Sequence, residues 1–251
     1  MSFLPEGWCP AADELSDKTL LITGASEGIG RAVAIECARR GAEVLLLARR
    51  EALLESVYDQ IVTEGGRSPG IIAMDLGGTD PEPFAQLAQQ LTASDVALHG
   101  LIHNASLLGE RRPLAHTSLA SWTQVMQTNI GGVFLLTRAL MPLLEAAPAA
   151  SVVLTSSGVG RKGKAYWGAY AVSKFATEGF MQVLADELAA TSSIRVNSLN
   201  PGAVNTAMRR AAYPAEPPNT NPLPEDLTAH WVFLMSDASR ALNGQALSVQ
   251  G

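Results

Sequence analysis

The sequence predicts an α/β protein in which one parallel sheet carries helices on both faces. Short apolar runs alternate along the chain with longer stretches of helical period, which is the pattern of repeated strand–helix–strand units. The runs are apolar at nearly every position, as expected of strands that are covered on both faces. The 251 residues, of which 47% are hydrophobic and 17% charged, are enough to bury a full core within one domain.

The predicted elements follow one another without an internal repeat. An N-terminal arm is expected at residues 1–17 and a single domain at 18–251. The strands are the apolar runs at 19–23, 43–48, 70–75, 100–103, 151–157, 194–199 and 245–249. Helices are predicted at 29–40, 51–64, 83–91, 118–145 and from about 170 to 190. Parallel strands in this arrangement require right-handed crossover connections.

Glycine and proline mark several boundaries. The first helix is expected to stop at Gly41 and the second at Gly65 and Gly66. The segment 213–224 holds five prolines and has no helical period, so it predicts an extended loop. We expect a substrate loop at about 207–224, because such loops often cover a pocket.

The composition argues against several classes of protein. A net charge of -6 disfavours a broad surface for nucleic acid or anionic lipid. Apolar runs such as 44–48 are far too short to span a membrane, and the N-terminus lacks the basic and apolar regions of a secretory signal. The cysteines, Cys9 and Cys37, have no partner at metal-binding spacing. We expect a cytoplasmic protein without a metal site.

A glycine-rich turn, Thr23-Gly-Ala-Ser-Glu-Gly-Ile-Gly30, joins the first strand to the first helix. Glycines there let the backbone approach a ligand, and the free N–H groups at the helix start favour a pyrophosphate. The turn is not a P-loop, because no Gly-Lys-Ser/Thr follows. Many strand-to-helix turns carry glycine for steric reasons alone, but the position after the first strand of an alternating pattern favours a nucleotide site.

Tyr170 and Lys174 lie four residues apart on a predicted helix and therefore share one face. An ammonium beside a phenol favours the phenolate, so we expect the pKa of Tyr170 to fall below its ordinary value of about 10. Ser157, at the end of a predicted strand, can hydrogen-bond the same substrate oxygen. The alternative is an aromatic packing residue next to a solvated lysine.

These motifs together resemble the short-chain dehydrogenase/reductase family. The resemblance covers nearly the whole chain from Thr19 to Gly251, and it extends to Asp75-Leu76, Asn129 and the segment Asn200-Pro-Gly-Ala-Val-Asn-Thr206. Around Tyr170 the sequence looks most like the bacterial YciK-like oxidoreductase subgroup. Two departures stand out, since His103-Asn-Ala-Ser106 occupies the place of the usual Asn-Asn-Ala-Gly.

The resemblance implies a Rossmann-type, doubly wound sheet of seven strands in the order 3-2-1-4-5-6-7. It implies hydride transfer between a nicotinamide and a carbonyl or alcohol carbon of a small molecule, and assembly as a homodimer or homotetramer. Its catalytic tetrad would be Asn129, Ser157, Tyr170 and Lys174, with Tyr170 exchanging the proton, Ser157 orienting the oxygen, Lys174 holding the ribose and Asn129 anchoring a water. The implied cofactor contacts are Gly24, Ser26, Glu27, Gly28, Ile29, Gly30, Arg49, Asp75, Leu76, Asn104, Ala105, Ser106, Tyr170, Lys174, Pro201, Gly202, Val204 and Thr206.

The end of the second strand bears on the choice of cofactor. NAD sites of this kind usually place a carboxylate there, whereas this chain has Ala48 followed by Arg49. A guanidinium can clamp the 2′-phosphate of NADP(H), with help from the Ser26 hydroxyl. Glu27 is unfavourable to that phosphate, and Arg50 is better interpreted as the start of a solvated helix. We predict NADP(H), with NAD(H) as the alternative.

Three functions are consistent with the sequence. The first is an NADPH-dependent reductase, the second an NAD-dependent alcohol dehydrogenase, and the third, disfavoured by the complete tetrad, a non-catalytic NADP(H)-binding sensor or scaffold.

Other residues near the motifs have less specific interpretations. Tyr166 is expected in the pocket wall, Trp167 in the cleft or in packing, His103 bonded to a backbone carbonyl, and Arg111-Arg112 as a solvated pair rather than an anion site.

Overall fold

The computed structural model describes residues 3–250, so residues 1 and 2 of the predicted arm and Gly251 at the end of the predicted domain lie outside the described part. The sheet is parallel throughout and has the order β3-β2-β1-β4-β5-β6-β7, which confirms the predicted fold class. Its strands are β1 Thr19–Thr23, β2 Glu43–Ala48, β3 Gly70–Ala73, β4 Gly100–His103, β5 Ser151–Thr155, β6 Arg195–Asn200 and β7 Ala246–Ser248.

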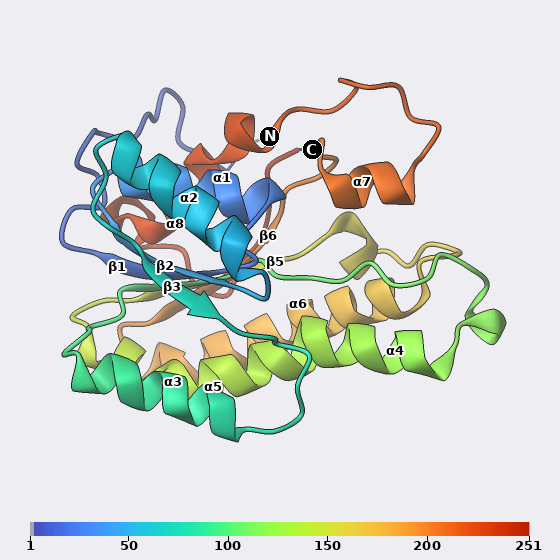
Figure 1. The fold of residues 1–251 in the computed structure, drawn as a ribbon, viewed down its shortest axis with the longest axis horizontal. Helices are drawn as coiled ribbons and strands as arrows, with labels where there is room; N and C mark the ends of the chain where they lie inside the picture. Colours follow the sequence, from blue (N-terminus) through green and yellow to red (C-terminus); the bar gives the residue numbers. More distant parts are fainter. Residues whose placement is uncertain (1–2, 251) are drawn as a thin grey trace.

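Helices cover both faces of the sheet. On one face lie α1, α2 and α8, on the other α3, α4, α5 and α6, while α7 stands apart beyond the ends of the strands (Figure 1). Their bounds are α1 Gly28–Arg39, α2 Glu51–Thr63, α3 Glu82–Ala93, α4 Leu119–Met126, α5 Gly132–Ala146, α6 Gly168–Ala189, α7 Ala207–Ala212 and α8 Ala229–Met235.

The core is divided between the two faces, and the alternation of side chains along each strand explains why the strands are apolar throughout. Leu20 and Ile22 of β1 pack in the layer beneath α1 and α8, whereas Leu21 packs in the layer with α5 and α6. The same division places Val153 of β5 on one side and Val152 on the other. Both faces must therefore be covered, as the sequence pattern indicates.

The strand order leaves a crevice beside β1. This strand pairs with β2 on one side and with β4 on the other, so the connections from β1 and from β4 leave in opposite directions. In an open α/β sheet, ligands bind outside the carboxyl ends of the strands at such a switch point. The glycine turn after β1 and the segment after β4 meet there.

Several predicted boundaries are wrong. The strand expected at 151–157 ends at Thr155, and the strand expected at 70–75 ends at Ala73. The helix expected at 118–145 is broken by a π-helical turn at Gln127–Gly131. Gly132 lies so close to the segment after β3 that a Cβ there would be 2.3 Å from the Leu76 carbonyl oxygen. Asn129 lies in this π-helical turn and is buried.

Two helices were not predicted. The short helix α7 begins the predicted substrate loop, which has no helix between residues 213 and 223. The helix α8 is buried at six of its seven positions, from His230 to Met235. A short segment that is apolar on every side has no helical period, which is why its sequence pattern does not reveal it.

The N-terminal arm packs against the α1 and α8 face. Trp8 meets Phe233 edge to face, with ring centroids 4.9 Å apart, and Phe3 lies 5.4 Å from the His230 ring. Leu15 is completely buried in the same core layer, and its N–H donates to the Arg40 carbonyl. The arm therefore closes one side of the core.

This packing predicts that the arm contributes to stability. Leu15→Ala is expected to lower the free energy of unfolding by about 2–5 kcal/mol, because it removes a fully buried side chain and leaves a cavity. Leu119, which is 79% exposed at the start of α4, offers a matched control, and Leu119→Ala should change stability by less than about 0.5 kcal/mol. Urea denaturation followed by circular dichroism measures both. Equal stability of the two variants would show that the arm is not part of the folded core.

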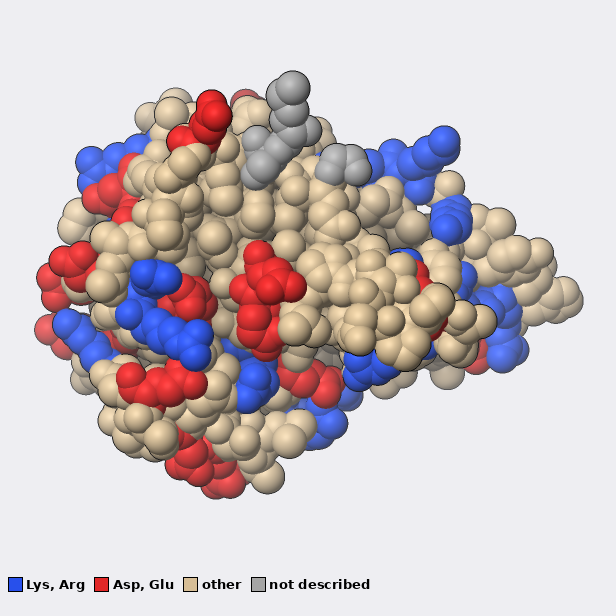
Figure 2. All heavy atoms as spheres, turned by 90° about the horizontal axis from the view of Figure 1, so that it is seen from above, with Lys and Arg blue, Asp and Glu red and all other residues tan. Residues whose placement is uncertain are grey.

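Charged side chains of both signs are scattered among uncharged residues on the face shown in Figure 2. Ion pairs among the described residues include Lys18 with Asp237 at 2.9 Å and Arg39 with Glu64 at 2.8 Å. Among residues 3–250, no helix has the length and apolar character needed to cross a membrane. The same residues contain no group of three His, Cys, Asp or Glu side chains that could hold a metal ion.

Candidate active site

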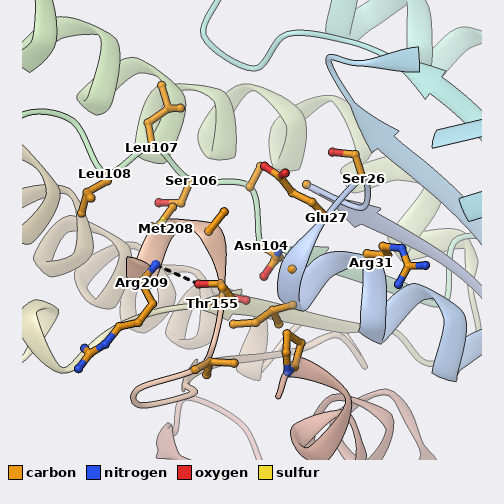
Figure 3. Close-up of a pocket in the computed structure, with 18 of the residues that line it drawn as sticks. Ser26, Glu27, Arg31, Asn104, Ser106, Leu107, Leu108, Thr155, Met208 and Arg209 are labelled. Carbon is orange, nitrogen blue, oxygen red and sulfur yellow. Dashed lines mark hydrogen bonds between the residues drawn. The ribbon is translucent and has the colours of Figure 1, made fainter. Parts of the chain in front are cut away.

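A cleft of about 550 Å³ opens at the carboxyl ends of the central strands. Figure 3 shows the glycine turn and α1 on one side of it and the segments after β4 and β6 on the other. All the residues assigned to cofactor or catalysis from the sequence line this cleft except Gly30 and Asn129. The lining members are Gly24, Ser26, Glu27, Gly28, Ile29, Arg49, Asp75, Leu76, Asn104, Ala105, Ser106, Ser157, Tyr170, Lys174, Pro201, Gly202, Val204 and Thr206.

The glycine turn is shaped by steric limits at three positions. Gly24 has φ +67° and Gly28 has φ +57°, values that residues with a Cβ adopt rarely. A Cβ on Gly24 would lie 2.9 Å from the Ala105 Cα, and a Cβ on Gly30 would lie 2.2 Å from the Gly24 carbonyl oxygen. Gly30 therefore packs against the backbone of the turn and does not line the cleft.

The start of α1 faces the same cleft. Its first residue is Gly28, and the preceding Glu27 makes no side-chain capping hydrogen bond. The first N–H groups of the helix are consequently not satisfied by that side chain, and the positive end of the helix dipole favours a phosphate there.

Hydrogen bonds between Thr23, at the end of β1, and the segment after β4 connect the ends of these two strands. The Thr23 hydroxyl accepts hydrogen bonds from the N–H groups of Asn104 and Ala105, each at 3.0 Å. The Asn104 side chain in turn donates to the Thr23 carbonyl at 3.3 Å. These bonds hold Ala105 and Ser106 against the glycine turn, so their position in the cleft is set by the backbone of both strands.

The arginines after β2 have different surroundings. Arg50 forms an ion pair with Glu27 at 2.9 Å, so the acidic side chain that seemed unfavourable to a phosphate is balanced by a neighbour. Arg49 lines the cleft, and within the described residues it has no hydrogen bond or ion pair. An unpaired guanidinium at the end of β2 is available for an anionic group on the ligand.

Tyr170 and Lys174 stand one turn apart on α6 and are both buried, with 8% and 3% of their surface exposed. The Lys174 Nζ lies 5.6 Å from the centre of the Tyr170 ring. The predicted lowering of the phenol pKa is wrong for the protein alone. Burial raises the pKa of Tyr170 to about 12, and a hydrogen bond from Ser157 only partly opposes this rise.

Lys174 is held by the backbone of β5. Its Nζ donates a hydrogen bond of 2.8 Å to the Thr155 carbonyl. Burial lowers the pKa of Lys174 to about 8, and the negative charge of Glu178 acts in the opposite direction. The ammonium therefore points into the protein at the floor of the cleft, not into solvent.

Asn129 lies outside the cleft lining but supports it. Its Nδ2 donates to the Leu107 carbonyl and to the Ser173 hydroxyl, each at 3.0 Å, and its Oδ1 accepts from the Leu107 N–H at 2.7 Å. Both N–H bonds of the amide are used. The side chain thus holds the Leu107 segment instead of offering a donor to water.

His103 departs from its predicted environment. Its Nε2 lies 2.8 Å from the Thr137 hydroxyl, so a side chain on α5 and not a backbone carbonyl bonds the ring. Burial lowers the pKa of His103 to about 3, and the charge of Lys174 adds to this effect. The imidazole is neutral at physiological pH and does not line the cleft, which makes it a packing residue.

The outer part of the cleft is mainly apolar. Trp167, on which Tyr170 packs with ring centroids 5.7 Å apart, lines it as predicted, whereas Tyr166 is 57% exposed and not part of the lining. Figure 3 shows Leu107 and Leu108 on one side and Met208 and Arg209 from α7 on the other. Ser106 and Ala212 also line the cleft.

A stack of rings and guanidinium groups connects α7 to this wall. The Arg111 guanidinium lies 4.5 Å from the centre of the Trp167 ring and 5.0 Å from the centre of the Tyr213 ring. The Arg209 guanidinium lies 3.9 Å from the centre of the Tyr213 ring. The prediction of a solvated pair is therefore wrong for Arg111. It holds only for Arg112, which is exposed and pairs with Glu110 at 3.5 Å.

Thr155 and Arg209 also line the cleft but were not identified from the sequence. Thr155 ends an apolar strand, and only its position two residues before Ser157 could have indicated a place in the site. Arg209 lies in the predicted substrate loop, but its place at the cleft depends on α7. The Thr206 hydroxyl caps that helix by accepting from the Arg209 N–H at 3.1 Å.

The cleft suits a dinucleotide on three grounds. Its glycine turn leaves room for a ligand close to the backbone, and Arg49 supplies an unpaired positive charge at the end of β2. In addition, the buried hydroxyls of Ser106 and Thr155 have no hydrogen-bond partner within the described residues, although buried polar groups normally have one. Both residues line the cleft, where a polar ligand can satisfy them.

Residues 18–217 match the family model described as short chain dehydrogenase. The chain is 46% identical over 241 residues to the uncharacterized oxidoreductase YciK of Escherichia coli strain K12, covering 96% of this chain and 95% of that protein. A short chain dehydrogenase from Shigella flexneri, whose crystal structure is complexed with NADP, superposes with a TM-score of 0.93 at 46% identity, covering 96% of this chain and all of that one. A short chain dehydrogenase from Escherichia coli CFT073 complexed with NADPH has the same TM-score, identity and coverage.

Proposed function

Because the chain belongs to the short chain dehydrogenase family, we propose that it is an NADP(H)-dependent oxidoreductase that transfers hydride between the nicotinamide and the carbon of a carbonyl or alcohol group. One observation carries this proposal. Tyr170, whose ring centre lies 5.6 Å from the Lys174 Nζ, lines the same cleft as Ser157, the glycine turn and Arg49. The NADP- and NADPH-bound relatives support the choice of cofactor.

The proposed roles of the reacting side chains follow from their surroundings. Ser157 hydrogen-bonds the substrate oxygen and orients it towards Tyr170. Tyr170 donates its phenolic proton to that oxygen when a carbonyl is reduced. A buried phenol whose pKa is raised to about 12 keeps this proton at neutral pH, so Tyr170 is in the form that can donate it to a carbonyl oxygen.

Lys174 and Asn129 have supporting roles in this proposal. The Lys174 ammonium binds the ribose hydroxyls and adds positive charge next to the phenolate that forms during reduction. Asn129 hydrogen-bonds Leu107 and Ser173. It therefore fixes the position of the Leu107 segment, which lines the cleft, relative to α6. A water held by Asn129, as implied by the family resemblance, would donate to an oxygen of this residue, since both side-chain N–H donors are occupied.

The small-molecule substrate is expected to be largely apolar around its carbonyl group. The side chains facing the outer cleft include Leu107, Leu108, Trp167 and Met208, which favour apolar contact.

Assembly as a homodimer or homotetramer stays a prediction, supported by exposed Phe134, Phe175 and Val183 on α5 and α6. The cytoplasm as location also stays a prediction from the sequence.

Initial-rate assays distinguish this function from the two alternatives. NADPH oxidation at 340 nm with a panel of aliphatic, cyclic and aromatic ketones and aldehydes should show turnover, with NADH slower by at least about tenfold, as expected for loss of one charge-assisted contact. Faster alcohol oxidation with NAD than with NADP would instead indicate the NAD-dependent dehydrogenase. Tight NADPH binding without turnover of any panel member would favour the sensor or scaffold.

A further inference from the structure

Two neighbouring residues at the end of β5 are hydrogen-bonded to α6, and the third lies beside it. The Thr155 carbonyl accepts from Lys174, and the Ser156 hydroxyl donates to Glu178 at 2.6 Å. Ser157, the next residue, is close enough to Tyr170 to lower its pKa. Tyr170, Lys174 and Glu178 succeed one another at four-residue intervals and so lie along one face of the helix. Tyr170 and Lys174 belong to the proposed chemistry, whereas Glu178 does not contact the reacting groups of that mechanism.

Glu178 is a buried carboxylate with a full set of donors. Only 7% of the residue is exposed. Its Oε1 accepts from Ser156 and, at 3.0 Å, from the Arg161 Nε, while its Oε2 accepts from the Ser198 hydroxyl of β6 at 2.6 Å. A buried charge is costly unless it is paired and hydrogen-bonded, and here both conditions are met.

Arg161 extends the network to the last strand. Its Nη1 donates to the Ser248 hydroxyl at 2.8 Å and its Nη2 to the Leu247 carbonyl at 2.7 Å. Glu178 and Arg161 thus connect β5, β6, β7 and α6 just below the cleft. Gly160 permits this packing, since a Cβ there would lie 2.8 Å from the Lys174 Cβ.

The network also sets the charges around Lys174. The ionisable groups facing this ammonium are Tyr170 and Glu178 on α6, His103 on β4 and, beyond Glu178, Arg161. His103 is neutral at physiological pH and Tyr170 keeps its proton. Glu178 is therefore the negative charge nearest to Lys174 in its helix, and it favours the protonated form of the lysine.

We propose that Glu178 is a positioning residue for the reaction: it fixes the Ser156–Ser157 backbone against α6 and keeps the Lys174 ammonium charged in its buried site. The part that concerns turnover rests on the proposed function. The part that concerns Lys174 does not, because it describes the protein alone.

Titration of Lys174 by NMR tests the proposal directly. Protein labelled with ¹³C at the lysine Cε contains, besides Lys174, only Lys18, Lys162 and Lys164, none of which is buried. In the parent protein Lys174 should titrate near pH 8. In Glu178→Gln its midpoint should move down by roughly one pH unit, because an opposite charge has been removed.

Two further variants separate this electrostatic effect from a general loss of structure. Arg161→Gln breaks the same ion pair but removes a positive charge, so the Lys174 midpoint should rise or stay in place. Glu187→Gln makes the same chemical change at an exposed position of α6 and should leave the midpoint unchanged. Thermal unfolding of each variant reports any loss of stability independently.

The pH profile of kcat adds a second measurement. With Glu178→Gln the alkaline decline should begin at lower pH than in the parent, and kcat at the optimum should fall about tenfold because Ser157 is less well placed. An unchanged Lys174 midpoint in Glu178→Gln, or the same downward shift in Arg161→Gln, would overturn the proposal. Absence of turnover in the parent would contradict the proposed function, while the NMR titration would still decide the role of Glu178 towards Lys174.

Discussion

Tyr170→Phe is expected to lower kcat by about three orders of magnitude, the middle of the range for loss of a general acid. The substitution removes one oxygen atom and keeps the ring that packs on Trp167. Affinity for NADPH, measured by quenching of protein fluorescence, should stay within about threefold of the parent, since no charged contact to the cofactor is lost. Turnover should thus disappear while cofactor binding persists.

Tyr166 provides the matched control for this experiment. It is a tyrosine four residues earlier, 57% exposed and outside the cleft lining, so Tyr166→Phe should retain nearly the parental kcat. A Tyr170→Phe variant that still reduced substrate at near the parental rate would remove Tyr170 from the mechanism. Equal losses in both variants would point to an effect on folding instead.

Arg49→Ala is expected to weaken NADPH binding by about 10- to 100-fold, the range for one charge-assisted contact to a phosphate. Binding of NADH, which lacks the 2′-phosphate, should change little. The preference for NADPH over NADH should therefore fall by the same factor. Dissociation constants measured for both cofactors at one fixed salt concentration give this ratio, because added salt screens the contact.

The Arg50→Ala variant tests whether the preference for NADPH depends on a specific contact of Arg49 or on any positive charge in this region. Arg50 is 58% exposed in its side chain and already paired with Glu27, so its removal should alter the ratio by less than about threefold. Loss of affinity for NADPH and NADH to the same extent in Arg49→Ala would mean that Arg49 shapes the adenosine pocket without recognising the phosphate. An equal effect of the two substitutions would contradict the assignment of the phosphate contact to Arg49.

The pKa of Tyr170 shows what sequence spacing leaves undecided. The four-residue interval to Lys174 establishes that the two side chains share a helix face, and the structure agrees. The interval contains no information on how deeply α6 is covered, and burial raises the phenol pKa more than its neighbours lower it. The prediction that Arg111 is solvated was wrong for the same reason, because burial cannot be read from the local sequence. Its guanidinium lies against the rings of Trp167 and Tyr213.

Local sequence determined much of this protein by itself. The alternation of apolar runs and helical stretches defines a parallel sheet, because strands covered on both faces need apolar residues at every position. The glycine turn after β1 and the Tyr170–Lys174 interval are likewise local, since each depends on backbone geometry over a few residues. These features were sufficient to predict the strand order through the family resemblance, which the fold and the comparisons confirm.

Tertiary structure alone decided the contacts between segments that are distant in the sequence. It paired Glu27 with Arg50, so that Arg49 is left free at the cleft, and it joined Glu178 to Ser156, Ser198 and Arg161 beneath the proposed active site. Each of these contacts brings together residues between 17 and 23 positions apart. Their charges and hydrogen bonds depend on burial and on the path of the chain, which are properties of the packed molecule and not of any short stretch of it.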